Sequence, residues 1–594
     1  MRILDYNSVL CRCLLVCVGI SLSFRGTYAV PYPRDPLARN ATTSVKKYLQ
    51  QRTDLITEER NLRFDAGAIN NATKQELKAM EIVDTIRFRE QQEVWRRDSN
   101  KEPGMPFLRA KDTIIQTELF KIIRKMPKGA LLHAHLDGMC DASYLLQLAL
   151  EYPRIHIRTA SGLNNSAPFP TPNLLALPDT LVQQNTNNAL LTSSDYVPNT
   201  WVSVQRARDG FPAELGGKDG FDQWIVNSLR INAEEAYVQY NTTTTIWAKF
   251  DQTFTVALGL TRYQPIFKRY TEQLLLSQVE DGISHVELRV GHGISSDLLS
   301  EDGAQNLTMG NVMENIQDAI DNVRANLTAQ GRKDEFMGAK AGASVIYMAL
   351  RAVSVEEMTE NLNECLELKA KYPDLMAGGL RITVCVVNPI LNLKIAIGFD
   401  MAGQEDPGHP LIFFAEPLLN FRAEANKRGL DIPFIFHAGE TLDDGGEVDS
   451  NLYDAFLLGS KRIGHGYSLA KHPLLMKKYK EHNIAVEVCP ISNEILRLTG
   501  SVRMHPLPDL LNNGLRVALS SDDPSVFQNY GLSFDFFQVI VASNITNLLS
   551  LGQLARQSIE YSLLDKKEKD QAFKSWESRW TSFVDDIVTG NSQL

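Results

Sequence analysis

Residues 130–137 read Ala-Leu-Leu-His-Ala-His-Leu-Asp, an apolar run that ends in two histidines separated by one residue. A short apolar run of this kind is consistent with a buried β-strand. In an extended strand, residues two apart point to the same side, so His133 and His135 can reach one ligand together. A single such pair is more often incidental than metal-binding, and its meaning depends on the rest of the chain.

Strand-like runs alternate with helical stretches from residue 128 to about residue 560. The runs are Ala130–Leu136, His285–Val290, Ser344–Met348, Ile397–Met401, Phe434–His437, Arg462–Gly466, Ala485–Val488 and Val517–Ser520. Near-continuous apolar strands that alternate with helices indicate a parallel sheet covered on both faces. We therefore expect an α/β protein built on a (β/α)8 TIM-type barrel, with a doubly wound sheet as the alternative.

Three later runs also end in polar residues. They finish in His437-Ala438-Gly439-Glu440, Gly464-His465-Gly466 and Ser520-Ser521-Asp522-Asp523-Pro524. Barrels assemble their active sites at the carboxyl ends of the strands. A histidine bonded within the core would explain any one of these motifs, but four strand ends with such residues favour a common site and the barrel.

The residue types indicate a metal-dependent hydrolase. Three imidazoles and a carboxylate suit zinc or another borderline divalent ion, and the proposed ligands are His133, His135, His437 and Asp522. A metal ion with one open coordination position would bind water there and lower the pKa of that water towards ~7. Glu440 then fits a proton donor and His465 a base that takes a proton from water. These residues do not name the substrate.

The first 29 residues resemble a cleavable secretory signal. Arg2 and Arg12 flank the start of an apolar stretch, Leu14 to Phe24, and small residues at Thr27 and Ala29 fit a cleavage site. The stretch is too short for a membrane anchor, which needs ~20 apolar residues. We expect a secreted, extracellular glycoprotein without a membrane span. The candidate glycosylation sites are Asn40, Asn71, Asn164, Asn241, Asn306, Asn326 and Asn544.

Composition sets the broad class. The chain has 594 residues, of which 44% are hydrophobic and 22% charged, as in ordinary globular proteins. Its net charge of −10, without a long basic run, argues against nucleic acid as a partner. The cysteines outside the signal, Cys140, Cys365, Cys385 and Cys489, are too few for a disulfide scaffold, although one bridge is possible.

Two segments flank or interrupt the expected barrel domain, residues 116–590. Residues 30–115 form a predicted helical arm, in which Thr73 and Glu76 fit a capping box. Residues 151–240 are rich in Pro, Asn, Thr and Gly. A loop of this length is uncommon in a compact domain, so we expect an inserted subdomain or lid, with a disordered excursion as the alternative.

Several motifs together resemble the adenosine deaminase family, and the signal, arm and insert resemble its secreted branch, the adenosine deaminase growth factors. The resemblance runs from about residue 40 to about residue 585. The motifs are Met126-Pro127-Lys128-Gly129, Trp247-Ala248-Lys249-Phe250, His437-Ala438-Gly439-Glu440, Arg462-Ile463-Gly464-His465-Gly466, Glu487-Val488-Cys489-Pro490-Ile491-Ser492-Asn493 and Ser520-Ser521-Asp522-Asp523-Pro524.

The resemblance implies a deaminase with one zinc ion per chain that converts adenosine and 2′-deoxyadenosine to inosine and 2′-deoxyinosine. Glu440 would protonate N1 of the purine, and His465 would act as base on the water. Asp523 would hold N7, and the backbone N–H of Gly403 would donate to N3. The residues that would line the nucleoside pocket are Asp137, Trp247, Phe250 and Phe254.

The resemblance also suggests partners and a wider role. The arm is similar to the family's dimerisation region, so we expect a homodimer. The insert is similar to a receptor-binding domain, so a cell-surface receptor or glycan is a candidate partner. Growth-factor-like signalling would follow from removal of adenosine. The alternatives are a hydrolase of the same fold that acts on another purine, and a receptor-binding signalling protein with weak catalysis.

Three features depart from the family pattern. Asp137 comes two residues after the second histidine, whereas some secreted members carry an aspartate directly after it. Leu350 stands where relatives have a polar pocket residue, which would remove one hydrogen bond to the nucleoside. Residues 379–398 interrupt a motif that resumes at Phe399, and we interpret them as a gene-prediction artefact or a genuine insertion.

Overall fold

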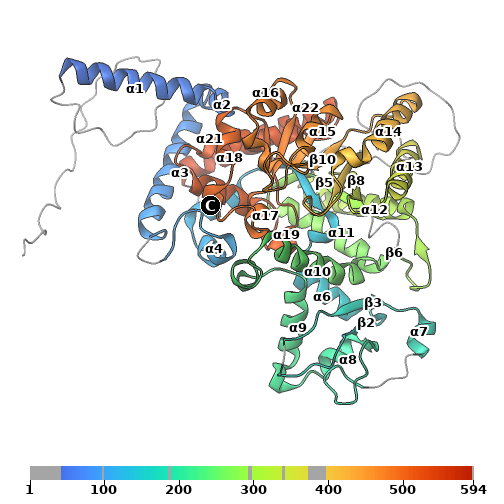
Figure 1. Cartoon of the computed structure of the whole chain (residues 1–594). Helices are drawn as coiled ribbons and strands as arrows, with labels where there is room; N and C mark the ends of the chain where they lie inside the picture. Colours follow the sequence, from blue (N-terminus) through green and yellow to red (C-terminus); the bar gives the residue numbers. More distant parts are fainter. Residues whose placement is uncertain are drawn as a thin grey trace, which may run out of the picture. The chain divides into compact units, whose positions relative to one another are not determined.

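The computed structural model describes residues 42–96, 100–166, 168–184, 189–291, 298–336, 342–371 and 397–590 (Figure 1). The chain divides into two units, residues 1–58 and 59–594. The described part of the first unit lies in helix α1 (Thr43–Asn61), none of whose residues is buried. The signal at residues 1–29, Asn40, Cys385 and residues 379–396 lie outside the described residues.

Eight parallel strands form a closed barrel in the second unit. Four of them pair in the order β1 (Gly129–His135), β5 (Ile283–Gly291), β8 (Ala343–Leu350) and β9 (Ile397–Ala402). The other four pair in the order β10 (Ile435–Ala438), β11 (Arg462–His465), β12 (Ala485–Val488) and β13 (Val517–Leu519). These are the eight runs expected from the sequence, with bounds that differ by at most two residues.

Backbone hydrogen bonds close the two half-barrels on each other. The N–H of Phe399 on β9 donates to the carbonyl of Pro433, just before β10, at 2.9 Å. At the other junction, the N–H of Asp522 donates to His133 O, and the N–H of His135 donates to Asp522 O, both at 3.1 Å. The barrel prediction is therefore confirmed, and the doubly wound alternative is wrong.

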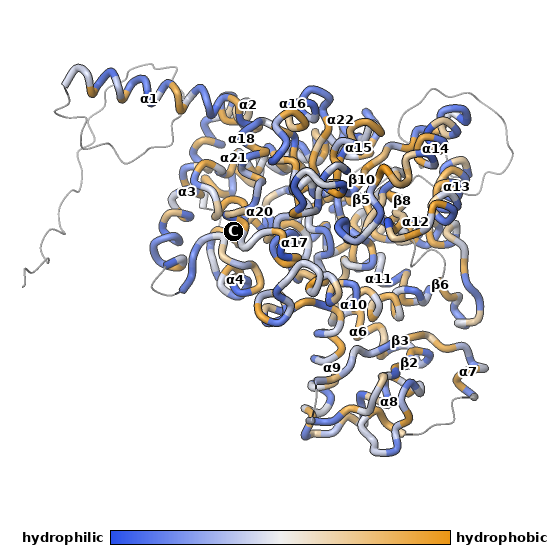
Figure 2. Tube along the Cα trace, in the orientation of Figure 1, coloured by the Kyte–Doolittle hydropathy of each residue, from blue (hydrophilic) through white to orange (hydrophobic). Residues whose placement is uncertain are grey.

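Helices cover the outside of the barrel. The longer ones between β5 and β10 are α12 (Met309–Ala329), α13 (Val355–Lys371) and α14 (Ala415–Arg428), and β5 is preceded by α11 (Gln264–Glu280). Those after β10 are α15 (Asn451–Leu457), α16 (Pro473–Glu481), α17 (Pro490–Ile495), α18 (Leu507–Asn512), α19 (Pro524–Phe527), α20 (Ser533–Ala542), α21 (Leu548–Glu560) and α22 (Lys566–Thr589). Every residue of β5 is buried, as expected for a strand covered by helices. In Figure 2, hydrophobic segments gather near β8 and β10, and hydrophilic turns mark α13 and α14.

Residues between β1 and β5 include a small folded subdomain. Its sheet has the order β3 (Asn173–Ala176), β2 (Ile155–Arg158), β4 (Val202–Ser203) and is antiparallel. The flanking helices are α6 (Ala142–Glu151), α7 (Asp179–Gln184), α8 (Val204–Asp209) and α9 (Gly217–Ser228), followed by α10 (Thr243–Thr261). Gly259 of α10 lies so close to β3 that an added Cβ would meet Leu174 O at 2.0 Å. The chain therefore needs glycine there.

The helical arm continues into the second unit as α2 (Ala66–Asn70), α3 (Lys74–Glu93), α4 (Phe107–Ile114) and α5 (Glu118–Lys125). The expected capping box begins α3: the N–H of Glu76 donates to Thr73 Oγ1, and the N–H of Thr73 donates to Glu76 Oε2. Val83 and Ile86 are buried on the inner face of this helix. Trp580 of α22 donates to Glu76 Oε1 at 2.9 Å, which ties α3 to the barrel's last helix.

Within the described ranges, Cys140, Cys365 and Cys489 are buried free thiols, so no disulfide joins any two of these three. Across those same ranges, no helix combines the length and apolar character that a membrane span requires.

Candidate active site at the carboxyl end of the barrel

Four side chains from three places in the barrel converge on one point. His133 and His135 end β1, His437 lies on β10, and Asp522 follows β13. One ligand atom from each lies within 4.8 Å of all the others. Nε2 of His133 and Nε2 of His135 each lie 3.3 Å from Asp522 Oδ1. The structure thus brings together all four residues that the sequence predicts as ligands.

Two observations fit this cluster to a divalent metal ion. Nε2 of His133 is buried and makes no hydrogen bond, although Asp522 Oδ1 lies 3.3 Å away, and a buried polar atom without a hydrogen bond is costly. Asp522 has a φ of +61°, a strained conformation for a residue other than glycine, and such strain concentrates at functional sites. A second grouping, in which His465 and Cys489 join His133 and Asp522, shares two members with the first and lies at the same place.

Buried carboxylates orient two of the imidazoles. Nδ1 of His133 lies 2.9 Å from Glu487 Oε2, and Nδ1 of His437 lies 2.8 Å from Asp400 Oδ2. A hydrogen bond at Nδ1 leaves Nε2 for a metal ion. Burial opposes ionisation of Asp400, but the hydrogen bond with His437 and the positive charge of Arg289 outweigh it and hold its pKa well below the usual value. Burial lowers the pKa of His437 to about 3, so this imidazole is neutral near neutral pH.

Glu440 and His465 lie beside the cluster. Glu440 Oε1 is 3.4 Å from His465 Nδ1 and has no hydrogen-bond partner. Burial, reinforced by the charge of Asp522, raises the pKa of Glu440 well above its usual value, which favours the protonated carboxyl. Burial lowers the pKa of His465 well below its usual value, which leaves a neutral imidazole able to accept a proton.

Helix α17 supports both groups from one side. Ser492 donates to Asp522 Oδ2 at 2.7 Å, and the amide of Asn493 lies 3.2 Å from His465 Nδ1. His465 itself has a φ of +59°, a second strained residue at this end of the barrel. The helix therefore fixes Asp522 and His465 relative to each other.

A carboxylate that the sequence analysis missed holds the backbone at Glu440. Glu405 is 1% exposed and accepts hydrogen bonds from the N–H groups of Gly439 and Glu440 and from Asn451 Nδ2, at 3.2, 2.9 and 2.8 Å. Arg351, also buried, donates to His437 O at 2.9 Å. Its neighbour Leu350, the residue that departs from the family pattern, is 37% exposed at the end of β8.

The predicted substrate-binding residues lie around the same strand ends. Asp523 is buried with Oδ1 unpartnered, and burial followed by the charge of Asp522 raises its pKa well above the usual value. An added Cβ at Gly138 would lie 2.1 Å from Asp523 Oδ1, so the turn that carries Asp137 packs directly on Asp523. Gly403 has a φ of +106° and follows β9 next to Arg351.

The three aromatic candidates follow one another along α10. The ring centroids of Trp247 and Phe250 are 5.0 Å apart, and those of Phe250 and Phe254 are 4.9 Å apart. Phe250 also stacks at 5.3 Å on Phe527, which lies in the short helix after Asp523. This contact places α10 beside the loop that follows β13, and Phe527 is a further residue that the sequence analysis missed.

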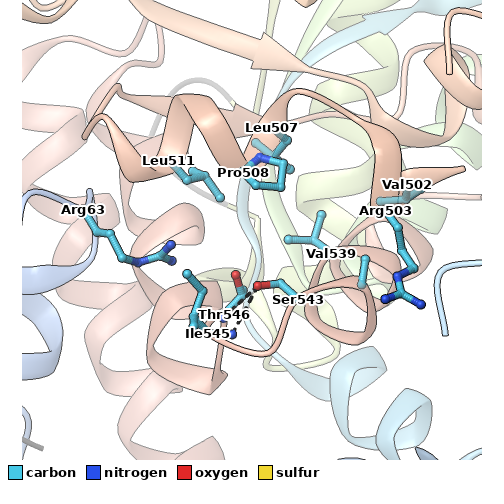
Figure 3. A pocket seen from close by; sticks show the side chains of 11 residues that line it. Arg63, Val502, Arg503, Leu507, Pro508, Leu511, Val539, Ser543, Ile545 and Thr546 are labelled. Atoms are coloured by element: carbon cyan, nitrogen blue, oxygen red, sulfur yellow. Dashed lines mark hydrogen bonds between the residues drawn. The ribbon is translucent and has the colours of Figure 1, made fainter. Parts of the chain in front are cut away.

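A pocket elsewhere in the second unit is separate from this chemistry (Figure 3). Apolar side chains of α18 and α20 line it, with Arg63 and Arg503 among the polar residues. The guanidinium of Arg63 is bonded to Asp65 and Asn512. The pocket contains none of the predicted site residues, so we do not assign the reaction to it.

Comparison with known proteins identifies the family to which the chain belongs. A family profile described as adenosine deaminase matches residues 389–575, and one described as adenosine/AMP deaminase N-terminal matches residues 13–123. The chain is 34% identical over 478 residues to adenosine deaminase of Lutzomyia longipalpis, which covers 80% of each chain. It is 30% identical over 559 residues to adenosine deaminase 2 of Dictyostelium discoideum, covering 93% of this chain and 89% of the relative. The chain belongs to the adenosine deaminase family.

Another relative extends the match to nearly full length: adenosine deaminase 2 of Homo sapiens is 29% identical over 546 residues, covering 91% of this chain and 94% of the relative. In this adenosine deaminase family member, His437, Glu440, His465 and Asp522 lie in the segment matched at residues 389–575. His133 and His135 lie between the two matched segments. The fold brings them to the same point as the others.

Proposed function

We propose that the protein hydrolyses adenosine and 2′-deoxyadenosine to inosine and 2′-deoxyinosine with release of ammonia. The observation that carries this proposal is the convergence of His133, His135, His437 and Asp522 beside the buried Glu440, whose pKa is raised. Membership of the adenosine deaminase family supports the choice of substrate class.

The four converging side chains would hold one zinc ion. The unpartnered Nε2 of His133, two further imidazoles and one carboxylate form a donor set that suits zinc. When bound, the ion supplies Lewis acidity that makes water a nucleophile at neutral pH.

Glu440 and His465 would move the protons. Glu440 would donate its proton to N1 of the purine, which makes C6 more electrophilic. His465 would accept one proton from the water as its oxygen attacks C6, and would pass that proton to the leaving amino group. As the C6–N bond breaks, ammonia departs and the remaining hydroxyl proton returns to Glu440, so protons and electrons balance.

Other residues would orient the base. Asp523, whose pKa is raised by burial and by Asp522, would donate a hydrogen bond to N7 in its protonated form. The backbone N–H of Gly403 is assigned to N3. Asp137, with Trp247, Phe250 and Phe254 on α10, would enclose the nucleoside and exclude water.

The direct test uses the purified full-length chain loaded with zinc. Adenosine, 2′-deoxyadenosine, adenine and AMP are incubated with it, and ammonia and the purine product are measured. The proposal expects inosine and 2′-deoxyinosine in equal amounts to ammonia, with little product from adenine or AMP. Release of ammonia from adenine alone would favour another purine as substrate, and folded, zinc-loaded protein that releases no ammonia would refute the proposal.

An extracellular location is part of the proposal. It is supported by the predicted signal and by the six described candidate asparagines, all of which are exposed: Asn71, Asn164, Asn241, Asn306, Asn326 and Asn544. Removal of adenosine outside the cell would then be its route to growth-factor-like signalling. Expression in secretory cells, followed by glycosidase treatment of protein from the medium, tests location and glycosylation together.

We also assign roles to the remaining segments. The arm would mediate a homodimer, because Val45, Tyr48 and Leu55 on α1 are exposed apolar residues and an isolated helix gains little stability by itself. The insert, residues 151–240, would bind a receptor or glycan.

Residues 379–398 remain a candidate gene-prediction artefact, although Ile397 and Gly398 lie in β9. Light scattering of the full chain tests whether it is a dimer. Sequencing of the transcript tests whether residues 379–398 are encoded in the mature message.

A further inference from the structure

Five charged side chains on the barrel strands form a buried cluster, which reaches two of the proposed metal ligands through Asp400 and Glu487. They are Arg289 and Glu287 on β5, Asp400 on β9, Arg462 on β11 and Glu487 on β12, and each is at most 1% exposed. Burying a charge costs several kcal/mol even when it is paired, and apolar residues would often stabilise such a core as well or better. We therefore infer that these charged residues, in strands that are otherwise apolar, are present because they serve the active site rather than stability.

Arg289 bonds both carboxylates that orient the histidines, Asp400 and Glu487. Among the described contacts of these five side chains, no other reaches both. Its Nε donates to Asp400 Oδ2 at 2.6 Å, and its Nη2 donates to Glu487 Oε2 at 2.7 Å. Its Nη1 donates to Leu132 O at 3.0 Å, in the strand that carries His133. One planar guanidinium therefore has all three of its nitrogens engaged.

The oxygens that Arg289 contacts are the ones that face the imidazoles. Asp400 Oδ2 lies 2.8 Å from Nδ1 of His437, and Glu487 Oε2 lies 2.9 Å from Nδ1 of His133. An unbroken series of contacts thus runs from His437 through Asp400, Arg289 and Glu487 to His133. These two histidines come from β10 and β1, which lie in different half-barrels.

We propose that Arg289 is a positioning residue that couples His133 to His437, so that the two histidines present Nε2 to the metal ion as one preformed unit. This inference rests on the proposed function, because it assumes that the four converging side chains bind a metal ion. The planar fork of arginine can serve two carboxylates in fixed directions, whereas the single ammonium of lysine has no such geometry.

Arg462 provides a matched control inside the same layer. It is equally buried and bonds Glu487, but through Oε1 rather than Oε2. Its other partners are Glu287 and the carbonyl of Tyr561. Replacing Arg462 with lysine therefore removes a buried guanidinium of the same type, and its contacts with the described residues include neither Asp400 nor the oxygen that faces His133.

The experiment compares Arg289→Lys with Arg462→Lys in the full-length chain. Zinc affinity is measured by competition with a chromophoric chelator, the ligand field by the visible spectrum of the Co²⁺-loaded protein, and folding by thermal unfolding of the metal-free protein. We expect Arg289→Lys to bind zinc about 10–100-fold more weakly with an altered Co²⁺ spectrum, the usual effect of removing an outer-shell partner. Arg462→Lys should keep the wild-type spectrum and remain within about threefold of wild-type affinity.

The outcomes separate this inference from the proposed function. Wild-type protein that binds no zinc would refute the proposed function, and the inference with it. Wild-type protein that binds zinc, together with an Arg289→Lys variant of unchanged affinity and spectrum, would overturn the coupling alone. Equal effects of the two lysine variants on affinity and spectrum would also overturn it, because they would show a general loss of packing.

A second set of variants keeps the test decisive if Arg289→Lys does not fold. Asp400→Asn, Glu487→Gln and the double variant preserve side-chain shape. If Arg289 couples the two histidines, the loss of zinc affinity in the double variant will differ from the product of the single losses by at least about threefold, as expected for residues in one network. Independent, multiplicative losses would overturn the proposal.

Discussion

At the carboxyl end of the barrel, Glu440 and Asp523 are buried with a carboxyl oxygen that has no hydrogen-bond partner. In the inserted subdomain, by contrast, Trp224 is buried among Phe169, Phe211 and Phe221, and its indole N–H donates to Pro170 O at 3.2 Å. The two regions lie in the same unit of the chain. The barrel end keeps polar atoms unsatisfied, which lowers stability but leaves them free for substrate, whereas Trp224 in the subdomain has its one polar atom hydrogen-bonded and is stabilised by packing.

The largest effect should come from removing a proposed metal ligand. His437→Ala should lower the rate of adenosine deamination by more than about four orders of magnitude, because water without a metal ion keeps a pKa near 15.7 rather than near 7. Ammonia release and zinc content of the purified variant check this. His409→Ala, a change at a histidine outside the cluster, serves as the control, and near-wild-type activity of His437→Ala would show that the reaction does not need this ligand.

Glu440→Gln should come next. The amide keeps the shape of the side chain but cannot donate an acidic proton, so kcat should fall by about 10²–10⁴. Zinc content and thermal stability should stay near the wild-type values, because the amide has the same size as the carboxyl and Glu440 is not a proposed ligand. Equal kcat values for the variant and the wild type would remove Glu440 from the mechanism.

Trp224→Ala tests whether packing stabilises the inserted subdomain without contributing to catalysis. Truncating a buried tryptophan should destabilise the subdomain by about 3–5 kcal/mol, while kcat per folded molecule stays near the wild-type value. Limited proteolysis within residues 151–240 and steady-state kinetics measure the two effects, with Trp224→Phe as the conservative control. A fall in kcat comparable to that of Glu440→Gln would mean that the subdomain takes part in catalysis as a lid.

The smallest effect concerns Glu494, a buried carboxyl on α17 that plays no part in the proposed reaction. Burial raises its pKa from 4.5 to about 8, and it accepts hydrogen bonds from Phe107 N–H and Tyr237 O–H. Above pH 4.5 the unfolded chain loses this proton while the folded chain keeps it. Stability from this group is therefore present at low pH and is lost as the pH rises towards 8.

Glu494→Gln keeps an acceptor for both donors but has no proton to lose. The fall in melting temperature between about pH 5 and pH 8 should therefore be smaller in this variant than in the wild type. Thermal unfolding at a series of pH values measures the difference. Parallel curves for the two proteins would show that Glu494 does not titrate in this range.

Much of the barrel was predictable because its strands are short apolar runs with polar residues at one end. His133, His437, His465 and Asp522 could be grouped for the same reason, since the carboxyl ends of barrel strands meet. The roles of Glu405, Asp400 and Glu487 were not predicted, because each depends on a partner far away in the sequence. A signal for Glu487 was present in the sequence, because it is a charged residue within an otherwise apolar strand, and the same is true of its partners Arg289 and Arg462.

Other features lay beyond sequence patterns. The inserted subdomain has a three-stranded antiparallel sheet that its composition, rich in Pro, Asn, Thr and Gly, did not indicate. The stacking of Phe250 on Phe527 depends on how α10 packs against the loop after β13, which local propensity does not encode. The antiparallel sheet and the Phe250–Phe527 contact therefore depend on tertiary packing and could not be predicted from local sequence patterns.

The most direct test is a crystal structure of the zinc-loaded protein with anomalous scattering recorded at the zinc edge. We expect one strong peak per chain at this end of the barrel, within bonding distance of His133 Nε2, His135 Nε2, His437 Nε2 and an Asp522 oxygen, at about 2.0–2.2 Å. Fully active protein with its zinc at a different place, or with these four side chains apart from one another, would contradict the account.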